Sequence, residues 1–358
     1  MNQSKITIVF VVDSISETSI PLRLIQGLDL KYFNPIILCV KSSKNRKSER
    51  SILAHSVELY YLREINSLLK ILKKNQQVII HSHHTRSSLL VLILSKMGII
   101  NSKYCFTLHS HFSRYSFLQK AIFKKILQTS DLRIYNSYST LYSINQQSNE
   151  THQVIYNGVE FVDFNKTNFD QRLKRIKNFN HLKVGIIGRL EKIKNVDATL
   201  MVLSEFSKRN INLEVDIIGS GSQKQVLKDL ANTLGIQHFC RFLDVMPHRK
   251  VMRLYQTYDI VFILSSQEGF CNVAVEAASQ GCLLVLSDIE VFREMYRNNE
   301  VIFADNLDPI QIANIIERRR NEIDLFNLSR NIRTSYSFEN MVGNYSSFYF
   351  SLCKTDFR

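Results

Sequence analysis

The feature that most constrains the fold is an alternation, along almost the whole chain, of short β-branched runs with segments of helical periodicity. The runs expected to be strands are Ile6–Val12, Ile36–Val40, Val78–His81, Tyr104–Leu108, Arg133–Tyr135, Val154–Tyr156, Val184–Ile187, Val215–Ile218, Ile260–Leu264, Leu283–Leu286 and Val301–Phe303. Helical periodicity is clearest at Phe117–Gln128, Ala198–Lys208, Gln223–Leu234 and Ile310–Arg319. Because so many alternating strands exceed one ordinary open sheet, we expect an α/β protein of two doubly wound, Rossmann-like domains.

A charged segment at residues 170–180 separates the two expected domains, because it breaks the alternation before a new buried strand opens at Leu182. We therefore expect an N-terminal domain at residues 1–170 and a C-terminal domain at residues 181–336. Residues 337–358 are rich in aromatic side chains that favour burial. They predict a C-terminal helix that packs back on the N-terminal domain.

The basic residues of the chain are concentrated in its first half. Residues 1–180 contain 25 Lys and Arg against 11 Asp and Glu, whereas residues 181–358 contain 21 of each. This excess predicts an anionic partner, such as nucleic acid, a membrane surface or a phosphorylated substrate, unless it serves only solubility. Two segments combine cations with apolar residues, as membrane-surface helices do. They are residues 65–74, with Lys70, Lys73 and Lys74, and residues 117–128, with Lys120, Lys124 and Lys125.

The cysteine pattern and the hydropathy pattern predict a cytoplasmic protein, and the basic first half predicts that it binds peripherally to the inner face of the cytoplasmic membrane. Six cysteines are scattered without a Cys-x-x-Cys pair, which is typical of a reducing compartment. No apolar stretch approaches the roughly 20 residues of a membrane span. Ile6–Val12 is better explained as a buried strand than as part of a signal peptide.

The strongest chemical signal is a pair of glutamates, Glu268 and Glu276, with seven residues between them. The first follows a predicted strand and the second lies about two turns into a predicted helix. Gly269 permits close approach of the backbone, and the N–H groups after it would form an anion site at the helix start. This combination indicates a ligand with both phosphates and hydroxyls, such as a sugar nucleotide. An ordinary first-turn carboxylate on an amphipathic helix is the alternative.

A second signal is the basic loop of residues 188–195, which follows another predicted strand. Arg189 and Lys194 could both reach a diphosphate, the first as a planar fork and the second as a point charge. A solvated basic loop is the alternative.

In combination, the two segments resemble the C-terminal half of the retaining family-4 glycosyltransferases. That family has the GT-B fold, in which two Rossmann-like domains face each other across a cleft. The resemblance continues in order over nearly the whole chain, at residues 80–83, 107–110, 130–134, 155–159, 218–221, 241–243 and 258–261.

The resemblance implies roles for individual residues. Arg189 and Lys194 correspond to the pair that binds the donor diphosphate. Glu268 corresponds to the glutamate beside the donor sugar, and Glu276 to the glutamate that binds the ribose. His109 corresponds to the active-site histidine close to the transferred sugar. The remaining donor-binding positions, for phosphate and nucleobase, are Gly269, Phe270, Cys271, Asn272, Val273 and Phe242.

No metal and no cofactor are expected. The sequence has no Asp-x-Asp motif, so fixed cations and a helix start would have to neutralise the leaving diphosphate. His81, His83 and His84 lack an acidic or cysteine partner nearby in sequence, which argues against a metal site there.

Two departures from the family stand out. The turn at residues 13–19 lacks the family's glycines, and Cys271 replaces a glycine, where a positive φ would strain the backbone.

The expected function is transfer of a hexose or amino-hexose, with retention, from a nucleotide diphosphate sugar to a glycan or lipid-linked acceptor. UDP is favoured over GDP, and the expected setting is bacterial lipopolysaccharide or capsule assembly. Two alternatives stay open. One is a basic nucleic-acid-binding protein, although no known nucleic-acid module occurs. The other is a catalytically degenerate transferase that serves as a partner subunit. The sequence gives no indication of oligomeric state.

Overall fold

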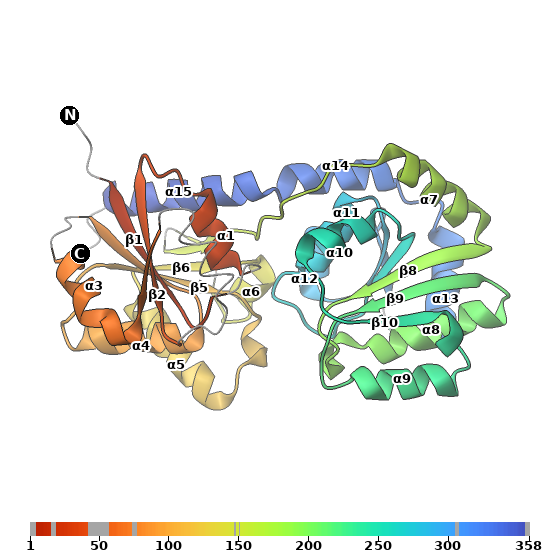
Figure 1. Cartoon of the computed structure of the whole chain (residues 1–358), viewed down its shortest axis with the longest axis horizontal. Helices are drawn as coiled ribbons and strands as arrows, with labels where there is room; N and C mark the ends of the chain where they lie inside the picture. The colour runs from red at the N-terminus through yellow and green to blue at the C-terminus, as the bar shows by residue number, and fades with distance from the viewer. Residues whose placement is uncertain are drawn as a thin grey trace. The chain divides into compact units, whose positions relative to one another are not determined.

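The computed structural model describes residues 5–15, 19–41, 57–73, 77–146, 148–149, 151–304 and 308–354. The chain forms two compact units (Figure 1), one of Met1–Gly158 with Phe338–Arg358 and the other of Val159–Ser337. The division lies ahead of the boundary expected at residues 170–180. The reason is α7 (Lys166–Asn178), whose Phe169 and Ile176 are buried in the core of the second unit. Each unit is described by itself below.

The N-terminal unit contains a parallel sheet in the order β3-β2-β1-β4-β5-β6-β7. Its strands are β1 (Ile6–Val12), β2 (Phe33–Cys39), β3 (Glu58–Tyr61), β4 (Val78–Ser82), β5 (Lys103–Leu108), β6 (Leu132–Tyr135) and β7 (His152–Val154). Its helices are α1 (Ile20–Gly27), α3 (Ile65–Leu72), α4 (Thr85–Lys96), α5 (Phe117–Thr129), α6 (Tyr138–Tyr142) and α15 (Phe338–Lys354). The alternation had not predicted β3, whose side chains are only partly buried or exposed.

The two faces of this sheet carry separate cores, as the period of two along a strand requires. In β1, Ile8 and Phe10 join the core formed with α1 and α15, whereas Val9 and Val11 join the core formed with α3, α4 and α5. The aromatic side chains of α15 are therefore buried against the N-terminal sheet.

The C-terminal unit contains a parallel sheet in the order β10-β9-β8-β11-β12-β13. Its strands are β8 (His181–Ile187), β9 (Asn212–Ile218), β10 (Cys240–Leu243), β11 (Ile260–Ile263), β12 (Leu283–Ser287) and β13 (Ile302–Ala304). Besides α7, its helices are α8 (Val196–Lys208), α9 (Lys224–Thr233), α10 (His248–Tyr255), α11 (Asn272–Ser279), α12 (Glu290–Met295), α13 (Pro309–Arg319) and α14 (Leu325–Ser335). Helices α8, α9 and α13 build the main core on one face, and α10 and α11 lie on the other (Figure 1).

Both sheets confirm the expected pair of doubly wound α/β domains. In each, the strand order reverses beside the first strand, between β1 and β4 and between β8 and β11. Loops that leave neighbouring strands at such a switch point diverge and form a crevice at the carboxyl edge, where ligands of this architecture bind. Within the described residues, no helix is both long and apolar enough to cross a membrane.

Candidate active site

The two loops singled out in the sequence meet at the switch point of the C-terminal sheet. The basic loop leaves β8, and the loop of residues 265–271 leaves β11. Glycine is required where the basic loop crosses its neighbour. A Cβ at Gly219, whose φ is +148°, would lie 1.8 Å from the Gly188 carbonyl oxygen, and one at Gly221 would lie 2.3 Å from the Leu190 carbonyl oxygen. The backbones can therefore touch, and the basic loop is held rigidly.

Asn195 ties the basic loop to the neighbouring strand. It adopts a left-handed conformation with φ of 46°, which asparagine tolerates better than most residues. Its Nδ2 donates to the Leu264 carbonyl oxygen at 2.9 Å, and the Ser266 N–H donates to the Ile193 carbonyl oxygen at 2.9 Å. These two hydrogen bonds hold the basic loop and the loop of residues 265–271 together.

A buried ion pair lies between these loops. Lys194 Nζ pairs with Glu268 Oε1, and the Ser265 hydroxyl donates to the same oxygen at 2.8 Å. The Glu268 side chain is only 8% exposed and that of Lys194 is 21% exposed, so the pair is largely removed from water. Sequence analysis had placed these two residues near one ligand but had not predicted that they contact each other.

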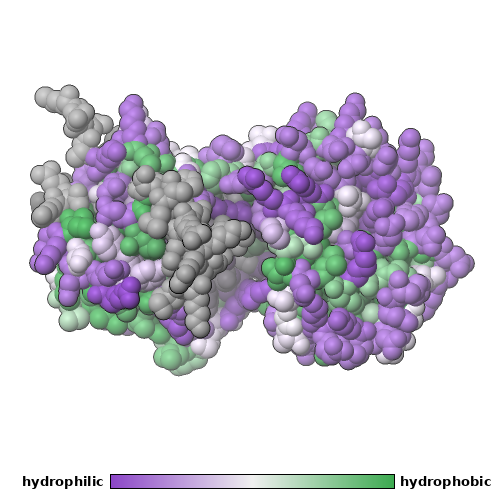
Figure 2. All heavy atoms as spheres, in the orientation of Figure 1, coloured by the Kyte–Doolittle hydropathy of each residue, from purple (hydrophilic) through white to green (hydrophobic). Residues whose placement is uncertain are grey.

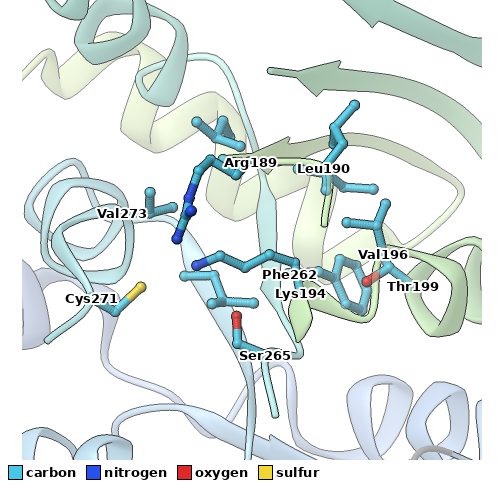
Figure 3. A pocket seen from close by; sticks show the side chains of 13 residues that line it. Arg189, Leu190, Lys194, Val196, Thr199, Phe262, Ser265, Cys271 and Val273 are labelled. Carbon is cyan, nitrogen blue, oxygen red and sulfur yellow. The ribbon is translucent and has the colours of Figure 1, made fainter. Parts of the chain in front are cut away.

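Arg189 and Lys194 extend into a single pocket, whose other side carries Ser265, Cys271 and Val273 (Figure 3). Arg189 is exposed and Lys194 is half-buried. The pocket therefore brings together two cations, a hydroxyl and the start of α11. This arrangement suits an anionic ligand, because N–H groups at a helix start attract negative charge.

Cys271 lies immediately before α11 with φ of −112°, in extended backbone. The expected strain at this position is therefore absent, because the conformation is open to any residue. Burial raises the pKa of the Cys271 thiol to about 12, so it is protonated and a poor nucleophile at neutral pH. Phe270 is buried and packs edge-on against Tyr336.

Glu276 lies on α11, away from the Lys194 pair, and contacts α10. Its Oε1 is 2.8 Å from His248 Nε2, and its Oε2 accepts from the Tyr255 hydroxyl at 3.2 Å. Burial raises the pKa of Tyr255 well above its ordinary value, so this hydroxyl stays a donor. Sequence analysis missed His248, since nothing in the pattern links it to a glutamate 28 residues away.

Phe242 is not among the residues that line this pocket. Its ring packs against the main core of the C-terminal unit, with Lys228 Nζ 5.9 Å from the ring centroid.

The N-terminal switch point carries a cluster of histidines. His81 and His83 lie at the end of β4, and His109 follows β5. His83 Nδ1 is 3.0 Å from His109 Nε2, and the rings of His81 and His83 are 4.0 Å apart, as their shared face predicted. Burial lowers the pKa of His109 to about 3, so the imidazole is neutral at pH 7.

Asp13 opens the turn that lacks the family's glycines. Its carboxylate accepts from the Ser87 N–H at 2.7 Å, in the first turn of α4, and its own N–H donates to His84 Nδ1 at 3.4 Å. A side-chain carboxylate therefore already satisfies the start of α4. Ser16, Glu17 and Thr18 of this turn lie outside the described residues.

The residues with described positions include no group of three or more His, Cys, Asp or Glu side chains that could hold a metal ion.

Two family models match consecutive parts of the chain. The Glycosyltransferase Family 4 model matches residues 22–161, and the model of glycosyl transferases group 1 matches residues 169–324. The matches meet near the division between the two units. They place the chain among proteins of the glycosyltransferase class.

Curated relatives match over part of their length. A D-inositol 3-phosphate glycosyltransferase of Corynebacterium diphtheriae is 29% identical over 38% of this chain and 34% of its own length. An uncharacterized glycosyltransferase of Methanocaldococcus jannaschii is 27% identical over 53% of this chain and 51% of its own. The chain thus spans between about a third and a half of these relatives.

Solved structures match over the whole chain. HepE of Anabaena, in complex with UDP and glucose, has a TM-score of 0.78 at 14% identity and covers 97% of this chain and 100% of its own. The lipopolysaccharide outer core galactosyltransferase WaaB has a TM-score of 0.71 at 15% identity, covering 97% and 99%. These likenesses concern the fold. Together with the family models they show that the chain belongs to the family-4 glycosyltransferases and has the GT-B fold.

Proposed function

We propose that the protein transfers a hexose or amino-hexose from a nucleoside diphosphate sugar to a hydroxyl group of a glycan or lipid-linked acceptor, with retention at the anomeric carbon. The observation that carries this proposal is the buried ion pair of Lys194 with Glu268, because Lys194 lines the same pocket as Arg189. Cations beside a carboxylate suit a ligand with both phosphates and hydroxyls. Retention is proposed from the resemblance to the family.

The chemistry follows from where charge develops. The bond from the anomeric carbon to the diphosphate oxygen breaks, the acceptor oxygen bonds to that carbon, and the acceptor proton passes to the leaving diphosphate. Arg189, Lys194 and the start of α11 would stabilise the negative charge on the leaving group, since fixed donors need no reorganisation. Glu268 would accept hydrogen bonds from sugar hydroxyls and favour positive charge on the sugar. No step in this scheme requires a metal ion.

We favour a uridine nucleotide over a guanosine nucleotide. HepE, which shares the fold, has been solved with UDP and with UDP-glucose. The proposed setting is bacterial surface polysaccharide assembly, in lipopolysaccharide or capsule. WaaB, of similar fold, acts on the lipopolysaccharide outer core according to its name.

We also propose that the N-terminal unit binds an anionic membrane surface through the start of α5. Phe117 is 90% exposed and Leu118 is 70% exposed, and the exposed Lys124 and Lys125 follow about two turns later on the same helix. Hydrophobic atoms gather along the lower edge of this unit, where Figure 1 draws α4 and α5 (Figure 2). Exposed apolar residues beside cations favour an interface of this kind.

The expected apolar face of residues 117–128 needs correction. Phe123 is buried, and Ile122 and Leu127 pack against the core of the unit, so this face covers the sheet. Membrane contact would therefore depend on Phe117 and Leu118. Lys70 and Lys73 of the other segment are exposed, and Lys74 lies outside the described residues.

A thermal-shift panel with UDP, GDP and CDP tests the donor site. A nucleotide that binds only the folded protein, supplied at a concentration about a hundred times its Kd, adds about 2.7 kcal/mol to the free energy of unfolding. This gain raises the melting temperature by several degrees. We expect the largest shift with UDP, and no shift in the matched variant Arg189→Ala. No shift with any nucleotide would reject the proposal.

The same preparation then decides whether the protein is an active enzyme. Release of UDP from a panel of UDP-sugars, with and without acceptor, would establish transfer. Binding without any turnover would favour the degenerate partner subunit. A shift with oligonucleotides and none with nucleotides would favour the nucleic-acid-binding alternative.

A further inference from the structure

Three histidine rings stack in a row at the carboxyl edge of the N-terminal sheet. The ring centroids of His81 and His83 are 4.0 Å apart, and those of His83 and His109 are 5.3 Å apart. His81 is fully buried, and its two ring nitrogens each lie 2.7 Å from a hydroxyl, of Tyr349 and of Thr107. His81 is therefore satisfied by β5 and α15, and it forms a fixed floor for the ring of His83.

His83 differs from His81, because it is satisfied at one nitrogen. Its Nδ1 is 3.0 Å from His109 Nε2, whereas its Nε2 is buried without a hydrogen-bond partner among the residues that the structure describes. The residue is 3% exposed, and Phe10 stacks on it at 6.0 Å with an interplanar angle of 13°. The ring therefore cannot turn easily to find a partner for Nε2.

Both imidazoles of this pair are neutral at pH 7. Burial lowers the pKa of His83 well below its ordinary value, and it lowers that of His109 to about 3. A neutral imidazole has one donor and one acceptor, so their hydrogen bond admits two arrangements. Either His83 Nδ1–H donates to His109 Nε2, or the reverse.

The unpartnered nitrogen distinguishes the two arrangements. If His83 accepted at Nδ1, its proton would sit on Nε2 as a buried donor without a partner. If His83 donates from Nδ1, its Nε2 carries no proton, and the group without a partner is a lone pair. Buried orphan donors are the rarer state in proteins, which favours donation from His83. His109 then accepts at Nε2 and carries its own proton on Nδ1.

We infer that His83 is a positioning residue that holds His109 as the Nδ1–H tautomer and so presents a hydrogen-bond donor to a ligand oxygen. The backbone of His109 is fixed as well, because Asn136 Nδ2 donates to its carbonyl oxygen at 2.9 Å. A sugar hydroxyl is the oxygen expected under the proposed function, and only the identity of this oxygen rests on that function. His83 acts only through His109.

Two substitutions of equal size separate hydrogen bonding from packing. In His83→Asn the side-chain amide nitrogen stands the same number of bonds from Cα as Nδ1 of histidine, so the donor is kept. His83→Leu has the same number of side-chain heavy atoms as asparagine but no donor. The tautomer of His109 is measured in the free protein with ¹⁵N-labelled histidine, by long-range ¹H–¹⁵N correlation. The spectrum of His109→Gln supplies the assignment.

We expect the Nδ1–H form of His109 in the unaltered protein and in His83→Asn, and loss of that single form in His83→Leu. Transfer should follow the tautomer, with kcat reduced about tenfold in His83→Leu, the equivalent of one hydrogen bond, and the donor KM little changed. In His83→Asn, kcat should remain within about threefold of the unaltered value, which is a smaller change than the loss of one hydrogen bond would cause.

An Nε2–H form of His109 in the unaltered protein would overturn the inference, whether or not His83→Leu folds. Equal loss of kcat in the two variants would also overturn it, since only packing would then matter. Absence of transfer by the unaltered protein would reject the proposed function, while the spectra would still decide the role of His83.

Discussion

Loss of Arg189 and loss of Lys194 should reduce activity alike but affect stability differently. Both cations are proposed to neutralise the leaving diphosphate. Removing either should cost about 2–4 kcal/mol of transition-state stabilisation, which is roughly a 30- to 1000-fold loss in kcat/KM for the donor. Their structural surroundings are unlike, and this difference provides the control.

Arg189 is exposed, so Arg189→Ala should change the free energy of unfolding by no more than about 0.5 kcal/mol. Lys194 pairs with a Glu268 side chain that is 8% exposed, and after its loss the Ser265 hydroxyl still donates a hydrogen bond to that carboxylate. Breaking a buried pair costs about 3–5 kcal/mol, and the 21% exposure of Lys194 lowers our expectation to about 1–3 kcal/mol.

The double variant Lys194→Ala with Glu268→Gln tests the origin of that cost. Glutamine is neutral, so stability should return toward the unaltered value while activity stays low. Steady-state kinetics and thermal unfolding, measured on the same samples, give both quantities. Additive stability losses in the double variant would refute the coupling of the pair. Near-normal turnover in Arg189→Ala would refute the placement of the diphosphate.

Three further expectations follow. Chelator should leave the transfer rate almost unchanged, and a hundredfold loss restored by Mn²⁺ or Mg²⁺ would contradict the proposed site. Binding to vesicles should require anionic lipid, weaken with added salt and fall in the double variant Phe117→Ser, Leu118→Ser. Equal binding to neutral vesicles would count against the membrane surface. Arg172→Met should destabilise the protein by about 3–5 kcal/mol, because this fully buried guanidinium donates to the carbonyl oxygens of Tyr255, Tyr258 and Gln280. The matched change of the exposed Lys174 to Met on the same helix should have little effect.

The fold could be predicted from the sequence because several buried strands, such as β1, β11 and β12, contain continuous apolar runs and lie between helical segments. The run at Ile6–Val12 is buried at every position and coincides with β1. The domain boundary could not be predicted in the same way. Charge and broken alternation at residues 170–180 suggested a linker, but these residues belong mostly to α7, which buries Phe169, Ile176 and even the charged Arg172.

Some features of the candidate site could also be predicted from the sequence, and others could not. Loop residues that follow strands, such as Arg189, Lys194 and Glu268, could be found because the end of a parallel strand fixes where a loop begins. Contacts between elements that are distant in sequence could not be found in this way. His248 meets Glu276, and Tyr349 of α15 meets His81 268 residues away, through packing that no local pattern records. The conformation of Cys271 was also beyond the sequence, since whether φ is positive depends on how α11 begins.

The positive charge of the N-terminal half acts at its surface and not at its switch point. Burial lowers the pKa of His81, His83 and His109 far enough to leave all three neutral at pH 7. Asp13 adds a carboxylate beside them. The net charge of this half comes from lysine and arginine, and exposed residues such as Lys124 and Lys125 contribute to it. In the C-terminal half the opposite holds: charges balance overall, yet two cations enter one pocket. The local charges of the C-terminal pocket suit a phosphorylated ligand, and the N-terminal excess agrees with the anionic membrane surface that we propose as a partner.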